Sequence, residues 1–546
     1  MIPLGGLDGI GKNMTVFEYD EDMIVVDAGL MFPDDDHPGV DLILPDYTYV
    51  LENMHRLRAI IITHGHEDHT GALPYLLKDL GTSVPIYSSK LTLGFIEGKL
   101  AEQNIKNARF REVKAGEHVA LGLFGCDFFS VNHSIPAAMG VFIRTPAGNV
   151  LHTGDFKLDQ TPIDGVNTDF AAVSRFAKAG VDLMLSDSTN AANPNFTKSE
   201  AEVGKVLNQI ISGATKRVIV ASFSSHIHRI QQVCDAAVAA KRKVAVTGRS
   251  MLTNTKIARE LGYLRIDESN IIDAYAAKDI PPSKVVILCT GSQGEPLSAL
   301  ARMSNGEHRT VGIEEGDAVI ISATPVPGNE KAVTRVVNAL SKIGAVIYDK
   351  QTALVHVSGH AGAEELKLML TIAQPKNFMP VHGEAMHLRA HSKLAQDVGI
   401  PKKNIFILET GDTLLLDQSG ITKGTPVESG VVYVDGLSVG DVSAVVLKDR
   451  QTLANDGIVT VVCMIKRRES SAVGTPEIIM RGVSGGDDPE LTKDAVAVAA
   501  KTVANFAHEH RNNPNRLQRA LREALSSFLW ERCRRRPMII PIIMDV

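Results

Sequence analysis

The stretch Thr63-His64-Gly65-His66-Glu67-Asp68-His69 decides the fold class and the chemistry that this sequence predicts. It follows the apolar run Ala59-Ile60-Ile61-Ile62 and precedes a helical pattern, so we place it on a loop at the end of a strand. Its four potential metal ligands are His64, His66, Asp68 and His69. Such ligands on one loop can face one cavity and hold two divalent ions a few ångströms apart. A lone histidine is more often structural, whereas this density of ligands predicts a metal site.

The length and composition are those of a large globular protein. The 546 residues are enough for several domains with cores of their own. No apolar run reaches the roughly 18 residues that a membrane-spanning helix needs, so we expect a soluble protein without a membrane partner. The chain starts Met1-Ile2-Pro3-Leu4-Gly5-Gly6, without the basic and apolar regions of a signal peptide. We therefore expect a cytoplasmic location.

The cysteines and the net charge exclude several classes of protein. The five cysteines are dispersed and form no Cys-x-x-Cys pair, which argues against a disulfide framework and against a thiolate zinc site. The formal net charge of −6 argues against a surface that binds nucleic acid over its whole extent. A polyanionic substrate would have to be bound by local positive groups or by metals.

The first 200 residues alternate short strands with loops and helices. The expected strands are Met14 to Tyr19, Met23 to Val26, Arg58 to Ile62, Val84 to Tyr87, Asp127 to Val131 and Val141 to Arg144. Helical segments such as Ala72 to Leu80 lie between them, which is the pattern of an α/β sandwich. We assign residues 1–200 to the first part of this domain.

The pattern of residues 201–355 predicts a second domain, of the parallel α/β type. The helical patterns Glu200 to Ser212 and Ile227 to Lys241 separate apolar strands, as βαβ crossovers require. These strands are Arg217 to Ala221, Val244 to Thr247, Val285 to Cys289 and Ala318 to Ser322. Because histidine-bearing loops resume at His356 to His360 and Pro380 to Glu384, we expect the second domain to be inserted into the first, which continues over residues 356–425.

The remaining residues form a linker, 426–455, and a small α+β domain, 456–546. The expected strands of this domain are Gly457 to Lys466, Glu477 to Gly482 and Met538 to Val546, and its helices lie near Glu490 to His510 and Asn515 to Arg534. Its position suggests a module for dimerisation or for positioning substrate, with a purely stabilising appendage as the alternative.

The segment from His64 to His69 resembles the His-x-His-x-Asp-His signature of the metallo-β-lactamase superfamily. The resemblance extends to His133 in Ser130 to Pro136, Asp155 in Leu151 to Phe156 and His382 in Met379 to Glu384. It implies an αββα sandwich and two metal ions, one held by His64, His66 and His133 and the other by Asp68, His69 and His382, with Asp155 between them. Imidazoles favour Zn²⁺, and the carboxylates also admit Mn²⁺, so both metals remain open.

The inserted domain narrows the resemblance to the β-CASP group of nucleic-acid-processing nucleases. Asp187 in Leu185 to Thr189, His360 in His356 to His360, and His382 look like the motifs A, B and C of that group. The resemblance implies that His360 is the general acid, that Asp187 orients it, and that Asp68 serves the reaction as well as a metal. Taken alone, Asp187 could equally be a strand-end residue that caps a turn.

Nearly the whole chain is similar to bacterial ribonuclease J. The segments that carry this similarity include Pro3 to Gly6, Pro38 to Asp46, Thr63 to Gly71, Ser222 to Gln232, Thr290 to Pro296 and Pro325 to Asn329. The resemblance implies degradation of single-stranded RNA from a 5′-monophosphorylated end in the 5′-to-3′ direction, with internal cleavage as well. It also implies a homo-oligomer, dimer or tetramer, formed through the C-terminal domain, and association with subunits of an RNA-decay complex.

The family's 5′-phosphate pocket would lie at His356, Val357, Ser358, Gly359 and His360, together with Ser225 and His226. Hydroxyls, an imidazole and an exposed backbone N–H can donate hydrogen bonds to a dianionic phosphate. The alternative is that Ser222 to Ser225 only cap the helix that begins near His226, and both roles are compatible.

Two weaker features concern cations and RNA. Asp41 and Asp435 lie in glycine-containing turns and resemble positions of an additional structural cation, although such aspartates usually bond their own backbone. The basic residues Lys466, Arg467, Arg468, Arg532, Arg534, Arg535 and Arg536 could guide RNA phosphates, or could form an ordinary solvated surface.

Three other functions remain open from the sequence. A thioester or lactam hydrolase would share the histidines but would need neither the inserted domain nor Asp187 and His360. A DNA-directed β-CASP nuclease would differ in contacts to the 2′-hydroxyl, which one sequence does not locate. A non-catalytic scaffold subunit of an RNA-decay complex would normally lack some of the ligands, and here the ligand set is complete.

Overall fold

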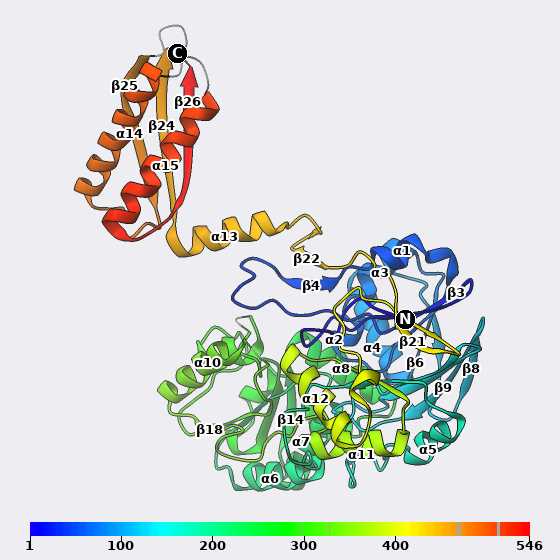
Figure 1. The fold of residues 1–546 in the computed structure, drawn as a ribbon. Coiled ribbons are helices and arrows are strands. Elements are labelled where there is room, and N and C mark those ends of the chain that lie inside the picture. The colour runs from blue at the N-terminus through cyan, green and yellow to red at the C-terminus, as the bar shows by residue number, and fades with distance from the viewer. Residues whose placement is uncertain (296, 327, 467–470, 510–513, 546) are drawn as a thin grey trace. The chain divides into compact units, whose positions relative to one another are not determined.

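The computed structural model describes residues 1–295, 297–326, 328–466, 471–509 and 514–545 (Figure 1). The residues named above that lie outside these ranges are Pro296, Pro327, Arg467, Arg468, His510 and Val546. The chain forms two compact units, one of Met1–Phe32 with Leu42–Val432 and one of Pro33–Asp41 with Tyr433–Val546. Among the described residues, no helix is long and apolar enough to cross a membrane.

Two six-stranded sheets form the centre of the first unit. The first has the order β1 (Ile2–Pro3), β2 (Thr15–Tyr19), β3 (Asp22–Val26), β5 (Leu57–Ile61), β6 (Pro85–Ser88) and β7 (Arg109–Glu112). The second has the order β19 (Asn377–Val381), β12 (Leu183–Asp187), β11 (Gly148–His152), β10 (Met139–Thr145), β9 (Phe124–Ser130) and β8 (His118–Leu121). Alternate residues of both sheets, such as Ile24 and Ile61 from the first and Val141 and Leu185 from the second, share one buried cluster. The two sheets therefore pack face to face.

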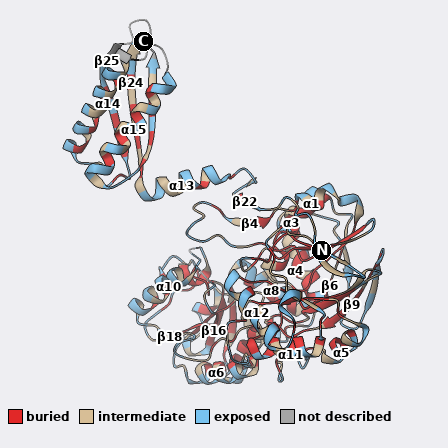
Figure 2. Ribbon diagram, in the orientation of Figure 1, coloured by how far each residue is buried: buried red, intermediate tan, exposed pale blue. Residues whose placement is uncertain are grey.

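Helices cover the outer faces of both sheets. Next to the first sheet lie α3 (Leu73–Leu80) and α4 (Lys90–Glu102), and next to the second lie α5 (Phe170–Ala179), α11 (Ala363–Ala373) and α12 (Ala385–Asp397). The short helix α2 (Glu67–Thr70) precedes α3. Leu76 and Ile96 pack with Ile60 on the first side. On the other side the rings of Phe142 and Phe176 stack with centroids 4.4 Å apart. The expected αββα sandwich is confirmed, and Figure 2 shows its strands as the most buried part.

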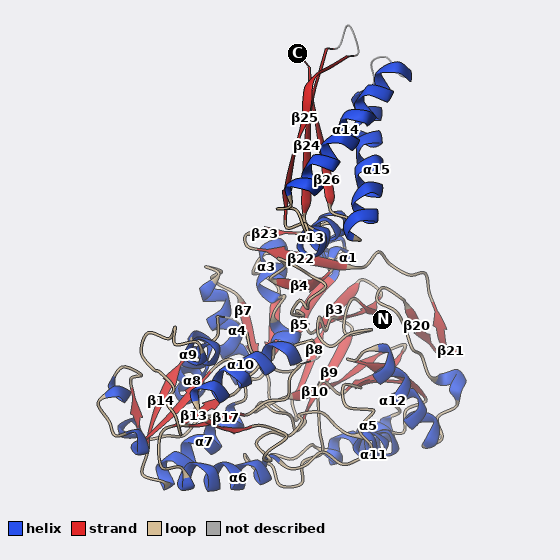
Figure 3. Cartoon of the chain, turned by 90° about the vertical axis from the view of Figure 1, so that its left-hand side faces the viewer, coloured by secondary structure: helices blue, strands red, loops and turns tan. Residues whose placement is uncertain are grey.

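The inserted domain is a six-stranded parallel sheet between helices, as expected (Figure 3). Its order is β15 (Ile271–Ile272), β14 (Lys243–Thr247), β16 (Val285–Cys289), β13 (Val218–Ala221), β17 (Ala318–Ile321) and β18 (Val346–Tyr348). Its helices are α6 (Glu200–Gly213), α7 (Ile227–Ala239), α8 (Arg249–Glu260), α9 (Ala299–Ser304) and α10 (Glu330–Ile343). Alternation along β13 explains the two layers, because Val218 and Val220 face α6 and α7, whereas Ile219 faces α9 and α10.

The second unit contains a three-stranded sheet with two helices on one face. β24 (Ile458–Lys466) pairs antiparallel with β25 (Ser471–Arg481) and parallel with β26 (Met538–Asp545). Val459, Val461 and Cys463 point from β24 to α14 (Pro489–Glu509) and α15 (Pro514–Cys533), where they meet Leu521 and Leu525. This domain is α+β, as the sequence predicts.

The remaining elements are strands, helices and turns outside the sheets and layers described above. They are β4 (Leu42–Pro45), α1 (Thr48–Glu52), β20 (Leu414–Asp417), β21 (Gly420–Lys423), β22 (Val431–Asp435), β23 (Ser438–Val439) and α13 (Ala444–Asp456), with 3₁₀ turns at Met54–Arg56, Glu268–Asn270, Ala276–Lys278, Pro282–Lys284 and Lys402–Asn404. The segment 426–455 thus carries two strands and a helix. All five cysteines are free, as expected.

Candidate active site

The loop after β5 brings its histidines together at the edge of the sandwich. Thr63 is held by Asp27, whose Oδ1 accepts the backbone N–H of Thr63 at 2.8 Å. From this anchor the chain turns into α2, and Nε2 of His64 lies 3.0 Å from Nδ1 of His66. His133, from the loop after β9, completes the group with its Nε2 3.0 Å from Nδ1 of His66. The ligand atoms of His64, His66 and His133 all lie within 4.8 Å of one another.

Next to these three imidazoles lies a second cluster of Asp68, His69, Asp155 and His382. Nδ1 of His382 is 2.8 Å from Oδ1 of Asp155, and its Nε2 is 3.3 Å from Oδ2 of Asp68. His382 has a left-handed φ of 54°, and its backbone N–H donates to the carbonyl of Gly6 at 2.7 Å. Side chains in this conformation are uncommon and concentrate at functional sites.

Asp155 lies between the two clusters. Its Oδ2 is 3.1 Å from Nε2 of His69 in the second cluster, and 3.8 Å and 3.9 Å from Nε2 of His64 and His133 in the first. One carboxylate therefore faces ligand atoms on both sides. This is the arrangement that the metallo-β-lactamase resemblance implies for a bridging group.

Hydrogen bonds orient the imidazoles for metal binding. Nδ1 of His133 lies 2.8 Å from the carbonyl oxygen of Gly359, and Nδ1 of His69 lies 2.8 Å from Oδ2 of Asp27. Such acceptors favour a proton on Nδ1, which leaves Nε2 as the atom that would bind a metal. Gly359 permits this approach, since a Cβ on it would lie 2.9 Å from the His133 ring.

The electrostatics of the site favour a cation. Burial holds the pKa of His64 and His133 well below the ordinary value, so both imidazoles are neutral. Burial also opposes a charge on His382, but Asp155 and Asp68 overcome this effect and raise its pKa to about 10. The carboxylates thus create a strongly negative potential beside neutral imidazoles. Such a donor set suits divalent ions like Zn²⁺ or Mn²⁺.

Asp187 and His360 form a pair beside the clusters. Nδ1 of His360 lies 2.7 Å from Oδ2 of Asp187, which is itself buried at the end of β12. The side chain of His360 is 21% exposed, against 2% for Asp187. Its ring centroid lies 5.0 Å from that of His133 and 5.7 Å from that of His382. Nδ1 of His360 also lies 3.9 Å from Oδ2 of Asp155, so Asp187, His360, Asp155 and His382 form a third group whose ligand atoms lie within 4.8 Å of one another.

The loops after β13 and β18 place the predicted phosphate-binding residues around a buried arginine. Arg229 is fully buried, donates from Nε to Oε1 of Glu200 at 2.7 Å, and donates from Nη1 to the carbonyl of Val355 at 2.5 Å. The rings of His226 and His356 lie near it with centroids 6.4 Å apart. Burial and the charge of Arg229 lower the pKa of His356 to about 3.

Several buried polar atoms at this place have no hydrogen-bond partner among the described residues. They include Oγ of Ser222 and Nδ1 of His356. Nε2 of His226 and Nη2 of Arg229 also have no hydrogen bond, but they lie 3.7 Å and 2.6 Å from Oε1 of Glu200. Buried polar groups are normally satisfied, so such a group indicates a missing partner. Ser225 is half-buried in the turn before α7. Within His356 to His360, Val357 is buried in the core and Oγ of Ser358 accepts the backbone N–H of His360 at 3.0 Å.

Ser222 to Ser225, for which capping was the alternative role, do not supply the N-cap of this helix. Helix α7 begins at Ile227, and its N-cap is His226, whose Nδ1 accepts the backbone N–H of Arg229. The turn at Phe223 to Ser225 comes before His226, so the serines precede the N-cap position of the helix. A histidine is outside the usual set of capping residues, so sequence preferences favoured the serines.

Asp41 and Asp435 have protein partners in the second unit. Oδ2 of Asp41 accepts the backbone N–H of Gly436 at 2.7 Å, and Asp435 pairs with Arg450. Among the described residues they belong to no cluster of three or more ligand groups, and their binding of a cation stays a prediction. Of the basic residues, Arg532 pairs with Asp494, Arg535 pairs with Asp456, and Arg534 and Arg536 lie over the ring of Trp530.

The fold and the site define a hydrolase of the metallo-β-lactamase class with an inserted β-CASP domain. Four family models match: the β-lactamase superfamily domain over residues 24–190, the ribonuclease J β-CASP domain over 215–340, the Zn-dependent metallo-hydrolase RNA specificity domain over 351–408, and the ribonuclease J C-terminal domain over 445–546.

Curated relatives match over the full chain. It is 44% identical to ribonuclease J of Mycolicibacterium smegmatis (100% of this chain, 96% of the relative), 42% identical to that of Thermus thermophilus (100% and 95%), and 40% identical to ribonuclease J2 of Bacillus subtilis (100% and 98%). The chain belongs to the ribonuclease J family. A solved structure of a protein of unknown function from Enterococcus faecalis shares the fold, with a TM-score of 0.54 and 15% identity over 75% of this chain and 97% of that one.

Proposed function

We propose that this protein is a metal-dependent ribonuclease that degrades RNA from a 5′-monophosphorylated end in the 5′-to-3′ direction and also cleaves RNA internally. Membership of the ribonuclease J family supports this activity, and so does the match to an RNA specificity domain. The observation that carries it is the convergence of both ligand clusters with the Asp187–His360 pair in one place. RNA maturation and decay in the cytoplasm would be its setting.

For the metal centre we propose two divalent ions per chain, with Zn²⁺ preferred and Mn²⁺ as an alternative. His64, His66 and His133 would hold one, Asp68, His69 and His382 the other, and Asp155 would contact both. When bound, such ions supply a water of lowered pKa and neutralise phosphate oxygens in the transition state. The neutral state of His64 and His133 and the position of Asp155 support this assignment.

For the chemical step we propose His360 as general acid. Nδ1 of His360 is bonded to Asp187, so a proton carried at Nε2 is the one that can pass to the departing 3′-oxygen of the cleaved RNA bond. Asp187 orients the ring and stabilises its charged form, since the pKa of His360 lies above its ordinary value despite burial. Asp68 acts from the metal side, 3.3 Å from Nε2 of His382.

For the RNA 5′ end we propose the pocket of Ser225, His226 and His356 to His360. Oγ of Ser222 and Nδ1 of His356 support it, because these buried atoms have no hydrogen-bond partner among the described residues and a phosphate would provide one. A 5′-triphosphate would not fit a pocket built for one phosphate group. RNA with a 5′-monophosphate should therefore be degraded faster than RNA with a 5′-triphosphate or a 5′-hydroxyl.

For the oligomer we propose a dimer or tetramer formed through the C-terminal domain. The face of its sheet opposite α14 and α15 carries exposed apolar side chains, namely Met464, Ile479, Ile540, Ile542 and Met544. Contiguous exposed apolar residues mark interaction surfaces. Subunits of an RNA-decay complex are further proposed partners.

The test is digestion of end-labelled single strands by the purified protein. Single-stranded RNA with a defined 5′ end should be shortened from that end, and a chelator should stop the reaction. Matched DNA should be cut far more slowly, and thioester substrates should be left intact. Undiminished RNA cleavage after complete removal of metal would refute the proposed mechanism.

A further inference from the structure

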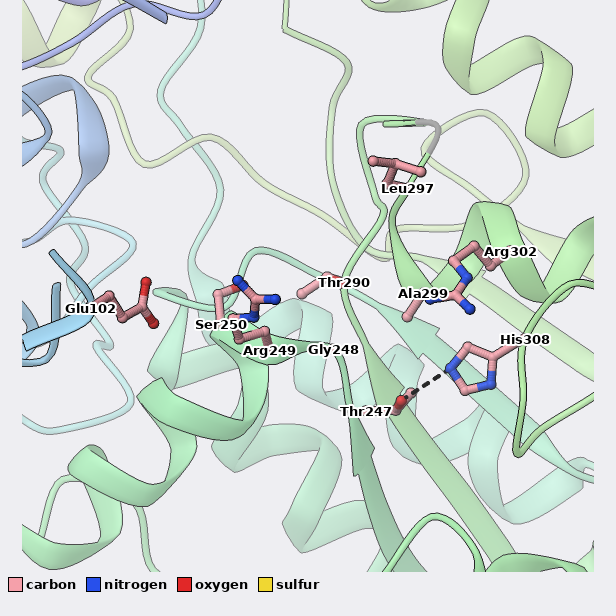
Figure 4. Close-up of a pocket in the computed structure, with 10 residues that line it drawn as sticks. All are labelled: Glu102, Thr247, Gly248, Arg249, Ser250, Thr290, Leu297, Ala299, Arg302 and His308. Carbon is pink, nitrogen blue, oxygen red and sulfur yellow. Dashed lines mark hydrogen bonds between the residues drawn. The ribbon is translucent and has the colours of Figure 1, made fainter. Parts of the chain in front are cut away.

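A cavity of about 580 Å³ lies at the edge of the parallel sheet in the inserted domain (Figure 4). Thr247, the last residue of β14, and Thr290, which follows β16, line it, and Gly248 and Arg249 lie beside it at the start of α8. None of the described residues of the two ligand clusters, or of the proposed 5′-phosphate pocket, is among the residues that line it. Its volume is in the range of small-molecule sites, roughly 300–1,000 Å³.

The topology of the sheet makes this edge a natural ligand site. Strand β14 continues to β15 on one side, whereas β16 continues to β17 on the other side of β13. Ligands of open parallel sheets bind at the carboxyl ends of adjacent strands whose connections leave in opposite directions. The sheet has a second such place between β13, which leads back to β14, and β17, which leads on to β18. The proposed 5′-phosphate pocket occupies that second place.

Two arginines and a histidine line the cavity, with Glu102 as the one acidic residue among its described lining residues. Arg249 lies on one wall, and Arg302 and His308 lie on the other (Figure 4). Neither arginine forms an ion pair with a carboxylate in the part of the chain that the structure describes, and Arg302 only donates to the carbonyl of Glu307 at 3.3 Å. Thr247 is hydrogen-bonded to His308 at 3.2 Å. Two guanidinium groups without acidic partners favour a phosphate.

The start of α8 adds backbone donors. This twelve-residue helix has no side-chain cap at Gly248, so the N–H groups of its first turn are free to bind an anion. Gly248 has a φ of 99°, and a Cβ on it would lie 2.6 Å from Oγ1 of Thr290. A glycine is therefore needed for the turn that brings the helix end to the cavity.

We propose that this cavity binds the phosphate of a nucleotide, at a place separate from the metal centre. Arg249, Arg302 and the first turn of α8 bind the phosphate. Glu102, which reaches the cavity from the end of α4, accepts hydrogen bonds from the ribose hydroxyls. Leu297, which is 88% exposed at the cavity, offers an apolar contact to the base. The nucleotide is either free in solution or part of the RNA chain, and the same groups recognise both.

The test measures binding of adenosine monophosphate to the full-length, metal-loaded protein by calorimetry. All variants are made in a His356→Ala background, which removes the proposed 5′-phosphate pocket. Arg249→Gln with Arg302→Gln should weaken binding at this site roughly ten-fold or more, because each arginine makes a charge-assisted contact. Lys256→Gln is the matched control, since Lys256 lies on the same helix, is 75% exposed and does not line the cavity.

A second variant separates binding from folding. Ser250 is exposed at the start of α8, so Ser250→Asp places a negative charge where the helix favours one. The thermal midpoint should stay the same or rise, while nucleotide binding should be lost through repulsion of the phosphate. If this region has only a structural role, Ser250→Asp should lower the thermal midpoint of unfolding and leave nucleotide binding unchanged.

Phosphorothioate RNA with a 5′-hydroxyl end, which resists cleavage, serves as the second ligand. If the variants bind adenosine monophosphate less tightly and bind the RNA as before, the ligand is a free nucleotide. If they also bind the RNA less tightly, the ligand is a nucleotide of the RNA chain. The proposal is overturned if Arg249→Gln with Arg302→Gln and Ser250→Asp bind both ligands as tightly as the Lys256→Gln control.

Discussion

Replacing Arg229 by methionine tests the buried ion pair that supports the proposed 5′-phosphate pocket. Arg229 is fully buried, and its guanidinium contacts Glu200, Ser322 and the carbonyl of Val355. Methionine keeps much of the volume and removes the charge. Glu200, which is 5% exposed, then keeps a buried carboxylate without its cation.

The expected loss follows from these contacts. The carbonyl of Val355 keeps a donor, since Oγ of Ser322 also bonds it at 2.7 Å. The main cost is therefore the uncompensated Glu200, and breaking a buried pair in this way typically costs about 3–5 kcal/mol. Adding Glu200→Gln to Arg229→Met removes the charge, so the double variant should recover more than half of the loss. Preference for 5′-monophosphate RNA should fall in both variants, because His226 and His356 lose their support.

Urea unfolding followed by two signals provides the assay. Far-ultraviolet circular dichroism reports mainly the larger unit, whereas the single tryptophan, Trp530, lies on α15 in the second unit. Arg229→Met should move the dichroism transition to a lower urea concentration, whereas the transition followed by tryptophan fluorescence should keep its midpoint. The reasoning is refuted if Arg229→Met unfolds within about 1 kcal/mol of the unmodified protein, or if Glu200→Gln makes the variant less stable still.

Three further predictions concern the reaction and the assembly. His360→Ala should lower kcat for RNA cleavage by about 10²–10⁴-fold with metal content unchanged, and a kcat near that of the unmodified protein would exclude His360 as the acid. His356→Ala should bring the cleavage rates of 5′-monophosphate and 5′-hydroxyl RNA together, as measured on end-labelled strands, whereas an unchanged ratio would place the 5′ end elsewhere. Met464→Lys with Ile542→Lys should yield a monomer in light scattering with the first unit still folded, because both side chains are exposed on the uncovered sheet face, and an unchanged mass would move the interface to another surface.

Four of the seven candidate metal ligands were predictable from a local pattern. The pattern is an apolar strand followed by His64, His66, Asp68 and His69. It predicts a loop between a strand and a helix, and the structure has this loop between β5 and α2. The more distant ligands, His133, Asp155 and His382, came from the resemblance. The structure brings all of these ligands into the two adjacent clusters.

Other parts of the site depend on packing that no local pattern reveals. Asp27 orients His69 from the end of β3, and an acidic residue after a strand usually signals only a turn. The pair of Arg229 and Glu200 joins two helices, α7 and α6, that are adjacent only in the folded domain. The only feature of the sequence that indicates this pair is a charged residue among the apolar positions of a helix. A charged residue normally points to solvent.

The boundaries of several elements also differ from the sequence expectation. Strand β25 begins at Ser471, whereas the expected strand began at Glu477, because its pairing with β24 continues past a bulge near Val462. Helix α13 occupies part of the expected linker, and its apolar positions are too few for a clear helical period.

The most direct test of the metal centre is metal content per chain, measured by mass spectrometry together with RNA cleavage. We expect about two divalent ions in the unmodified protein. His66→Ala and Asp68→Ala should each lose metal and cleavage together while the circular dichroism spectrum stays the same. Lys256→Gln, remote from the clusters, should change neither. Full cleavage by a folded His66→Ala or Asp68→Ala variant that no longer binds metal would contradict the account.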